Sequence, residues 1–175
     1  MRLRRLWTVG SGLPIAVLLV ATVIALGGCA SPSQDRSTTP ATPATFGQSI
    51  DQLDRLVVQR TNAFPSNHVR FKFPTTVSVT DPTAVQAVAR ALLALPKIPA
   101  GAIYNGPLDL GITYQLVFFA ADRRFPAVNV DATGMETVTG LGADRMAIDK
   151  PSFWHTLGVA MGLAQPDQST FAGSL

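Results

Sequence analysis

The sequence predicts an α+β fold: a mostly antiparallel sheet with two amphipathic helices packed on one face. Several segments alternate apolar and polar residues with a period of two, which is typical of half-buried strands. The later segments are joined by short, turn-rich connections that suit antiparallel neighbours. Only two segments carry a helical stripe, and they do not alternate with strands as the helices of a parallel sheet do.

The first part of the predicted sheet comes from three segments. Residues 53–60 fit either a helical stripe or a strand, and their β-branched residues favour the strand. Residues 69–73 alternate cleanly, and residues 76–80 continue the same period. Pro74 lies between them and indicates an edge strand or a bulge.

The first helix is predicted from its start signal and its stripe. Asp81 precedes Pro82, an N-cap followed by a residue that lacks the unpaired amide of the first turn. The apolar stripe of an amphipathic helix follows at Val85, Val88, Ala89, Leu92 and Leu93. Pro96 ends the helix.

A strand meander is predicted after a loop rich in proline and glycine. Residues 112–118 alternate strongly, residues 121–124 form a hairpin turn, and residues 125–131 return. Residues 135–139 and 145–148 predict two further short strands.

The second helix begins at Pro151, with a stripe at Trp154, Leu157, Gly158 and Met161. The predicted domain spans residues 48–164. Residues 165–175 are polar and are expected to fray.

The amino terminus has the pattern of a bacterial lipoprotein signal peptide. Basic residues precede an apolar run of signal-peptide length, and the only cysteine of the chain follows it. Residues 1–28 are the predicted signal, and the sulfur of Cys29 is the predicted site of the lipid. Residues 7–26 would just suffice for an uncleaved membrane helix, but two glycines and a proline interrupt their first half. The lipobox comprises Leu26, Gly27, Gly28 and Cys29.

Residues 29–47 predict a tether. They are rich in serine, threonine and proline and contain too little apolar surface to repay the entropy of ordering. An extended segment of this kind reaches at most about 50 Å. Such a tether would hold a domain away from the lipid surface.

Signal removal also changes the charge. The chain has 14 basic and 11 acidic residues, and three arginines leave with the signal, so the mature part is formally neutral. A neutral chain gains little from counterion release, which argues against nucleic-acid binding. With Cys29 acylated, no thiol remains for a disulfide or a thiol nucleophile.

The candidates for catalysis are weak. A zinc site needs three or four ligands, and neither His68 nor His155 has a second histidine at ligand spacing. His155 is interpreted as a flank of the last helix, and His68 as part of a turn fixed with Asn67. Ser66 lies close to His68 in the sequence but lacks a recognisable motif. The sequence therefore predicts no cofactor and no metal.

Two further patterns have simpler structural interpretations. Asp131 and Glu136, the only glutamate, could share a sheet end as paired carboxylates, although solvated loop positions are favoured. Residues 140–142 lack the third glycine and the helix of a phosphate loop, so a turn is favoured. Val117 and Phe119 lie on the polar side of their strand and, if exposed, would form a small apolar contact surface.

The amino terminus resembles the signal peptides of bacterial membrane lipoproteins, and the remainder resembles an uncharacterised domain of small bacterial lipoproteins. The matching stretches are residues 67–68, 73–74, 94–96, 131–134, 140–142 and 153–154. The resemblance implies cysteines at the positions of Gly106 and Met135, and their absence here removes a disulfide between the long loop and the sheet. It implies no known activity.

We therefore expect a lipid-anchored, extracytoplasmic binding or interaction domain without enzymatic activity. The membrane is contacted through Cys29, and the partner is an envelope protein, a wall polymer or a small ligand. One alternative is an envelope hydrolase that uses His68 or His155. Another is an inhibitor or accessory subunit of an envelope protein.

Overall fold

The computed structural model of the protein describes residues 46–99, 101–102, 104 and 106–175. The predicted signal, the lipobox, Cys29 and all but the last two residues of the predicted tether lie outside the described residues. Within the described part, no helix has the length and apolarity needed to cross a membrane.

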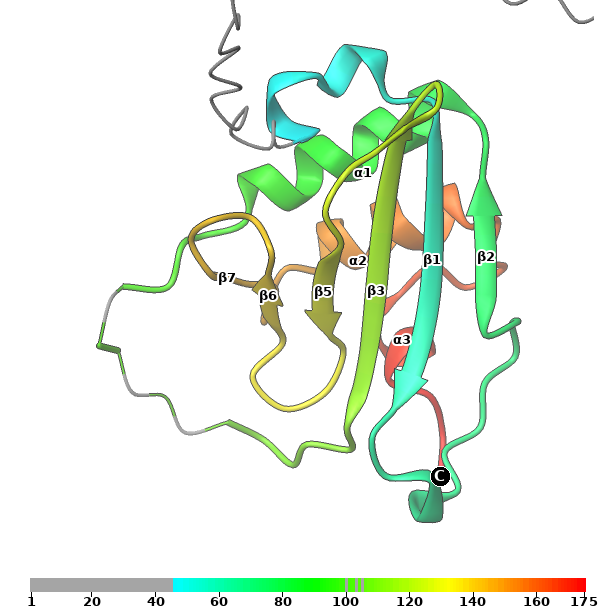
Figure 1. Ribbon diagram of the computed structural model, residues 1–175. Helices are drawn as coiled ribbons and strands as arrows, with labels where there is room; N and C mark the ends of the chain where they lie inside the picture. Colours follow the sequence, from blue (N-terminus) through cyan, green and yellow to red (C-terminus); the bar gives the residue numbers. More distant parts are fainter. Residues whose placement is uncertain (1–45, 100, 103, 105) are drawn as a thin grey trace, which may run out of the picture. The chain divides into compact units, whose positions relative to one another are not determined.

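The described residues form one antiparallel sheet of seven strands, ordered β2-β1-β3-β5-β6-β7, with β4 paired to β3 (Figure 1). Every strand pair is antiparallel. The strands are β1 (Arg55–Asn62), β2 (Thr76–Val79), β3 (Ile112–Ala120), β4 (Arg123–Arg124), β5 (Val128–Asp131), β6 (Thr137–Thr139) and β7 (Arg145–Met146). The predicted α+β class is confirmed.

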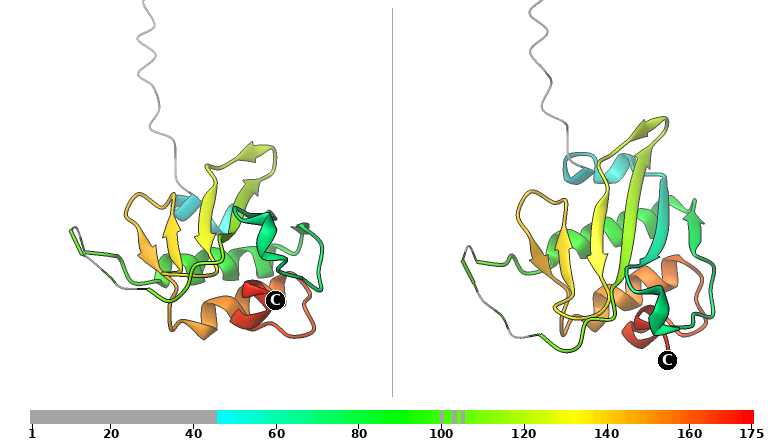
Figure 2. Two further views of the ribbon diagram at one scale, coloured as in Figure 1. Left: turned by 90° about the horizontal axis from the view of Figure 1, so that it is seen from below. Right: turned by 60° about the horizontal axis from the view of Figure 1, so that its bottom comes forward.

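Both long helices cover the same face of the sheet (Figure 2). They are α1 (Pro82–Ala94) and α2 (Pro151–Ala160). The carboxylate of Asp81 accepts a hydrogen bond from the Thr83 amide at 3.0 Å, as an N-cap does. Alternate strand residues point toward the helices and are buried with the helix stripes. This core includes Leu56, Val58, Tyr114, Leu116, Phe118, Val128, Val130, Val138, Val88, Leu92, Phe153, Trp154 and Leu157.

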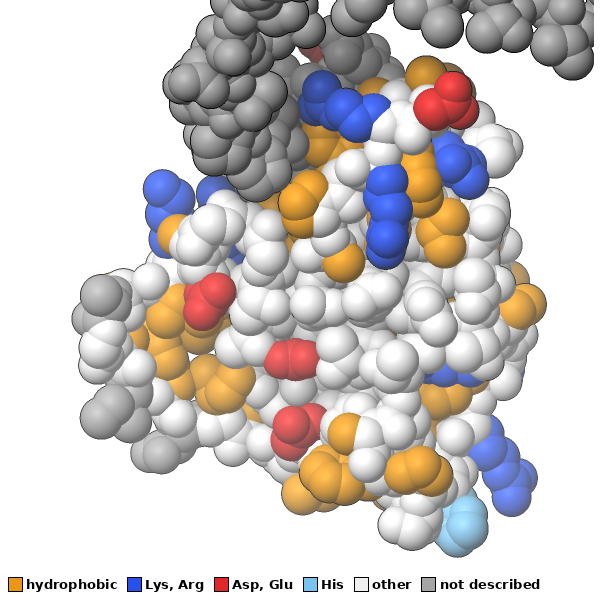
Figure 3. All heavy atoms as spheres, viewed as in Figure 1, with side chains coloured by type: hydrophobic (Ala, Val, Ile, Leu, Met, Phe, Trp, Pro, Cys, Tyr) orange, Lys and Arg blue, Asp and Glu red, His pale blue; other side chains and the backbone are white. Residues whose placement is uncertain are grey.

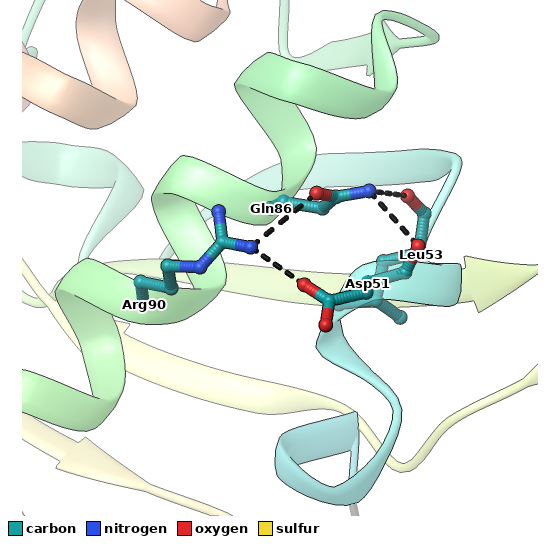
Figure 4. A network of polar contacts seen from close by, with 4 residues as sticks. All are labelled: Asp51, Leu53, Gln86 and Arg90. Carbon is teal, nitrogen blue, oxygen red and sulfur yellow. Dashed lines mark hydrogen bonds and ion pairs between the residues drawn. The ribbon is translucent and has the colours of Figure 1, made fainter.

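The described chain begins with two short 3-10 helices, η1 (Phe46–Gln48) and η2 (Ile50–Gln52), and η2 is fixed to α1 (Figure 4). Gln86 Nε2 lies 3.2 Å from the Asp51 carbonyl oxygen and 3.3 Å from that of Leu53. Arg90 Nη2 lies 2.7 Å from Asp51 Oδ1. Both charged side chains are largely exposed, so the ion pair itself adds little stability. The contacts with the two carbonyl oxygens fix where the chain enters the domain.

The prediction of a strand over residues 69–73 is wrong. After β1, the chain forms a third 3-10 helix, η3 (Pro65–Asn67), and rejoins the sheet only at Thr76. Between these points only Arg70 forms a bridge, and its partner is Ser174. The apolar alternation has another cause: Phe71 and Phe73 pack against the core beside the sheet instead of within it.

The prediction of a frayed tail is also wrong. Residues 168–172 form the helix α3 (Gln168–Ala172), whose N-cap Asp167 accepts a hydrogen bond from the Thr170 amide at 2.9 Å. Phe171 on this helix is fully buried. A buried aromatic side chain and a capped turn thus help to attach a segment that is otherwise polar.

The two positions at which the resemblance implies cysteines lie against each other. A Cβ atom on Gly106 would lie 2.5 Å from the sulfur of Met135. The Met135 side chain thus occupies the space that a side chain at position 106 would need. Packing attaches the long loop to the sheet here, without a covalent bond.

Candidate functional site

A groove lies between the segment that follows η3 and the carboxyl-terminal segment. It consists of two hollows, and the first has a volume of about 290 Å³. A second hollow of about 440 Å³ shares Lys72, Gln165 and Thr170 with it. The first hollow is lined by Arg70, Phe71, Lys72, Gln165, Ser169, Thr170, Gly173 and Ser174.

Arg60 on β1 holds the first wall of the groove. Its guanidinium lies 3.7 Å from the ring centre of Phe71 and 4.9 Å from that of Phe73. Its Nη1 also donates a hydrogen bond to the Phe73 carbonyl oxygen at 3.4 Å. Cation–π contacts of this kind attach residues 71–73 to the sheet, although they form no strand.

Tyr114 on β3 holds the second wall. Its hydroxyl donates a hydrogen bond to the Phe171 carbonyl oxygen at 2.8 Å, and the two rings pack edge to face. Burial raises the pKa of Tyr114 well above its ordinary value, so the hydroxyl stays protonated and able to donate. The second wall is therefore anchored in the core by both a ring and a hydrogen bond.

Backbone contacts join the two walls. The Arg70 amide donates to the Ser174 carbonyl oxygen at 2.8 Å, and the Ser174 amide donates back to Arg70 at 3.1 Å. The adjacent Gly173 has φ +79°, and a Cβ there would lie 2.5 Å from Cγ1 of Val69 and 2.9 Å from the Arg70 oxygen. Only glycine fits this close approach of the two segments.

The groove is basic and rich in hydrogen-bonding groups. Arg70 and Lys72 are exposed, and no acidic residue is among those described as lining the groove. The ion pair found among the described residues, between Arg90 and Asp51, lies elsewhere. The two cations of the groove thus have no described carboxylate partner, which suits an anionic ligand.

Behind the second wall lies a buried carboxyl group, that of Glu136. Only 4% of this residue is exposed, and its backbone has φ +49°, which is uncommon outside glycine. Its Oε2 accepts a hydrogen bond from Trp154 Nε1 at 2.9 Å, and its Oε1 accepts one from Gln168 Nε2. Burial raises the pKa of Glu136 above its ordinary value, the Trp154 and Gln168 donors lower it, and nearby Asp149 raises it further.

The raised pKa predicts a pH dependence that Glu136→Gln should remove. The folded protein holds this proton more tightly than the unfolded chain does. The contribution of Glu136 to the free energy of unfolding is therefore fully present below its ordinary pKa of 4.5. It is lost as the pH rises through the raised value. The amide side chain of the variant would keep an acceptor for Trp154 without the charge.

Chemical denaturation from pH 4 upward, in steps of about half a unit, would measure the difference between the two proteins. We expect the variant to gain stability relative to the wild type across the window that opens at the ordinary pKa. Asp122→Asn, in the exposed turn between β3 and β4, is the control and should leave the difference flat. Parallel curves for Glu136→Gln and the wild type would contradict the predicted shift.

The other predicted site residues are not brought together. His68 is an exposed residue with φ 55° that ends η3. His155 Nδ1 lies 3.2 Å from the Pro166 carbonyl oxygen, on the exposed side of α2. Asp131 contacts Thr113 and Thr137, so it shares no hydrogen-bond partner with Glu136.

Two of the turn predictions are confirmed. The side-chain Nδ2 of Asn67 donates to the Leu110 carbonyl oxygen at 2.7 Å. Its Oδ1 accepts a hydrogen bond from the backbone amide of Val69, which fixes the turn. Residues 140–142 lie in the connection between β6 and β7, with φ +93° at Gly140 and +85° at Gly142. Among the described residues, no three histidine, cysteine or acidic side chains group as metal ligands would.

The expected apolar contact surface of Val117 and Phe119 is exposed only in part, because Val117 is buried and Phe119 is half-buried. Val117 is only 6% exposed and lies opposite Val57 on β1. The Arg55 guanidinium stacks over the Phe119 ring at 3.8 Å from its centre. Figure 3 shows this open face of the sheet: mostly uncharged polar side chains and backbone fill its middle, and hydrophobic side chains gather beside basic ones at one end.

The sequence does not predict the groove, because the pattern of one wall predicts a strand and that of the other predicts a frayed tail. The alternation of Arg70 and Lys72 with two phenylalanines is typical of a half-exposed strand. It is equally typical of an irregular segment whose charged side chains face solvent and whose aromatic rings pack against the core. Asp167 and Gly173 bracket a short helix with the cap residues that helices use, a signal available in the sequence.

Comparisons of the chain with protein-family models, with curated proteins and with solved structures find no match.

Proposed function

We propose that the mature protein is a lipid-anchored, extracytoplasmic envelope lipoprotein whose folded domain binds a ligand without catalysing a reaction. The groove between residues 70–73 and 163–174 is the proposed binding site. The observation that carries the proposal is this groove, which presents two cations without described carboxylate partners among hydroxyl and amide groups. Anchoring rests on the sequence pattern that ends at Cys29.

The position of the groove supports a role in presentation. The described chain enters the domain beside α1, near the start of β1, whereas the groove lies where β1 ends and the chain terminates (Figure 1). The strand has eight residues, so these two points are separated by about 26 Å. A domain attached through its amino terminus would therefore present the groove at the end away from its attachment.

The anchor is tested by replacing Cys29. In cells fed an alkyne-labelled fatty acid, the wild-type protein should carry the label, and Cys29→Ser should carry none. The label is the readout, since an uncleaved signal could itself hold the variant in the membrane. Ser31→Ala, two residues further on, is the matched control and should keep the label. An unlabelled wild-type protein that begins at Met1 would contradict the proposal.

The binding role is tested by crosslinking in intact cells. A photoreactive amino acid at position 174, an exposed position in the groove lining that supplies neither of the two cations, should capture a discrete envelope component. The same group at position 159, exposed on α2, is the control and should not capture it. Identical products from the two positions would contradict binding in the groove.

A further inference from the structure

We propose that the groove binds an anionic glycan, a sugar chain that carries carboxylate or phosphate groups. This inference rests on the proposed function and names the class of ligand for the same groove. Three features of the walls favour it: the charge, the balance of hydrogen-bond donors and acceptors, and the mixed polar and apolar lining.

The charge selects an anion. Arg70 and Lys72 lie on one wall, two residues apart in the chain, so both face the same hollow. A guanidinium offers paired donors that match a carboxylate or a phosphate, and an ammonium adds a compact charge. Asp167 belongs to the segment that forms the other wall, but it is not among the lining residues and is engaged as the cap of α3. It accepts hydrogen bonds from Ser169 and Thr170, which lower its pKa.

The neutral groups suit sugar hydroxyls. Ser169 Oγ donates to Asp167 and Thr170 Oγ1 donates to the Gln165 carbonyl oxygen, each at 2.7 Å. With these protons engaged, both hydroxyl oxygens can act only as acceptors toward a ligand. Arg70, Lys72 and the Gln165 amide can supply donors. A sugar hydroxyl both donates and accepts, so it can use both kinds of group, whereas a fully deprotonated anion such as sulfate can only accept.

The lining and its extent suit a chain more than a small ion. Phe71 lines the first hollow, and Phe73 and Leu163 line the second one. These apolar surfaces can pack against the C–H faces of sugar rings, as aromatic and aliphatic groups do in mixed pockets. The two hollows share three lining residues and are therefore adjacent, which suits a ligand made of consecutive sugar units.

Calorimetric titration of the full-length lipoprotein in detergent would test the class of ligand. One probe is an oligogalacturonate, which carries a carboxylate on every sugar. A second is a poly(glycerol phosphate) that carries sugars, which has phosphates instead. The methyl ester of the oligogalacturonate is the neutral control, because it keeps the sugar rings and loses the charge. Nanodiscs rich in phosphatidylglycerol present anionic headgroups without a glycan.

The variant pair is matched in charge. Arg70→Gln with Lys72→Gln removes both groove cations, and Lys97→Gln with Arg124→Gln removes two exposed cations elsewhere. We expect saturable binding of at least one acidic glycan, weakened about tenfold or more by the groove pair and less than twofold by the control pair. The neutral ester should bind about tenfold more weakly than the acid. The affinity should also fall as salt is added.

Several results would overturn the proposal. They are equal binding of the acid and its ester, an equal loss in both variant pairs, or saturable binding of neither acidic glycan. Binding to the nanodiscs alone, sensitive to the groove pair, would make a membrane the partner instead. Crosslinking at position 174 to a component without a glycan would overturn the ligand class and leave the binding role intact. An absence of groove-specific crosslinks would remove the binding role itself.

Discussion

Replacing Trp154 by alanine should lower the free energy of unfolding by about 3–5 kcal/mol, the usual cost of truncating a large buried aromatic residue. Trp154 is fully buried and lies on α2. The centre of its ring lies 5.0 Å from the ring centre of Phe153 and 5.1 Å from that of Phe171. The indole also donates to Glu136, so the alanine variant leaves a buried carboxyl group without this donor.

Urea denaturation followed by circular dichroism would measure the loss. Val159→Ala, at an exposed position of the same helix, is the control and should change the free energy by less than about 0.5 kcal/mol. Trp154→Phe keeps a ring and removes the N–H donor, so it should fall between the two. A loss for Trp154→Ala no greater than that for Val159→Ala would contradict the proposed role of the indole in the core.

The elements predicted correctly are those whose local signals agree with their packing. Asp81, Pro82 and the apolar stripe after them define α1 without reference to the rest of the chain. Likewise, β3 alternates because one of its faces meets the helices and the other lies open. Hydrophobic periodicity records burial, and in both elements burial and secondary structure coincide.

The errors occur where burial comes from something other than regular secondary structure. Phe71 and Phe73 alternate because their rings join an aromatic cluster and contact the Arg60 guanidinium. Among the described residues, no strand pairs with them. The average polarity of the tail predicts fraying, whereas the buried Phe171 ring and hydrogen bonds of its backbone with Tyr114 and Arg70 attach it. A composition average cannot detect a single anchoring residue.

The groove could not be predicted for a related reason. Its walls are about a hundred residues apart in the sequence, and the backbone hydrogen bonds that join them run between Arg70 and Ser174, which are not in paired strands of the sheet. Glu136 shows the same limit. As an isolated acid between Met135 and Thr137 it has the pattern of a solvated loop residue, and its partners Trp154 and Gln168 come from two later helices.

The attachment of the groove's second wall predicts an unusual effect at Gly158. Alanine is favoured over glycine by about 1 kcal/mol inside a helix, so propensity alone predicts that Gly158→Ala stabilises α2. The structure predicts the opposite sign. A Cβ there would lie 2.6 Å from Cα of Pro166, a backbone atom that cannot move without shifting the segment before α3. Overpacking of this kind costs about 1–3 kcal/mol before the propensity gain is subtracted, so we expect a net loss of up to about 2 kcal/mol.

The location of the damage distinguishes this effect from a general loss of stability. Hydrogen exchange should quicken in Gly158→Ala at the Arg70 and Ser174 amides, whose mutual hydrogen bonds close the groove. Gly162→Ala is the matched control: its Cβ would meet nothing within 4 Å, but its φ of +71° makes alanine strained by about 1 kcal/mol. It should lower global stability without selective exchange at those two amides. A stabilised Gly158→Ala protein with unchanged exchange would mean that Pro166 does not pack on α2 and that the second wall is held from β3 alone.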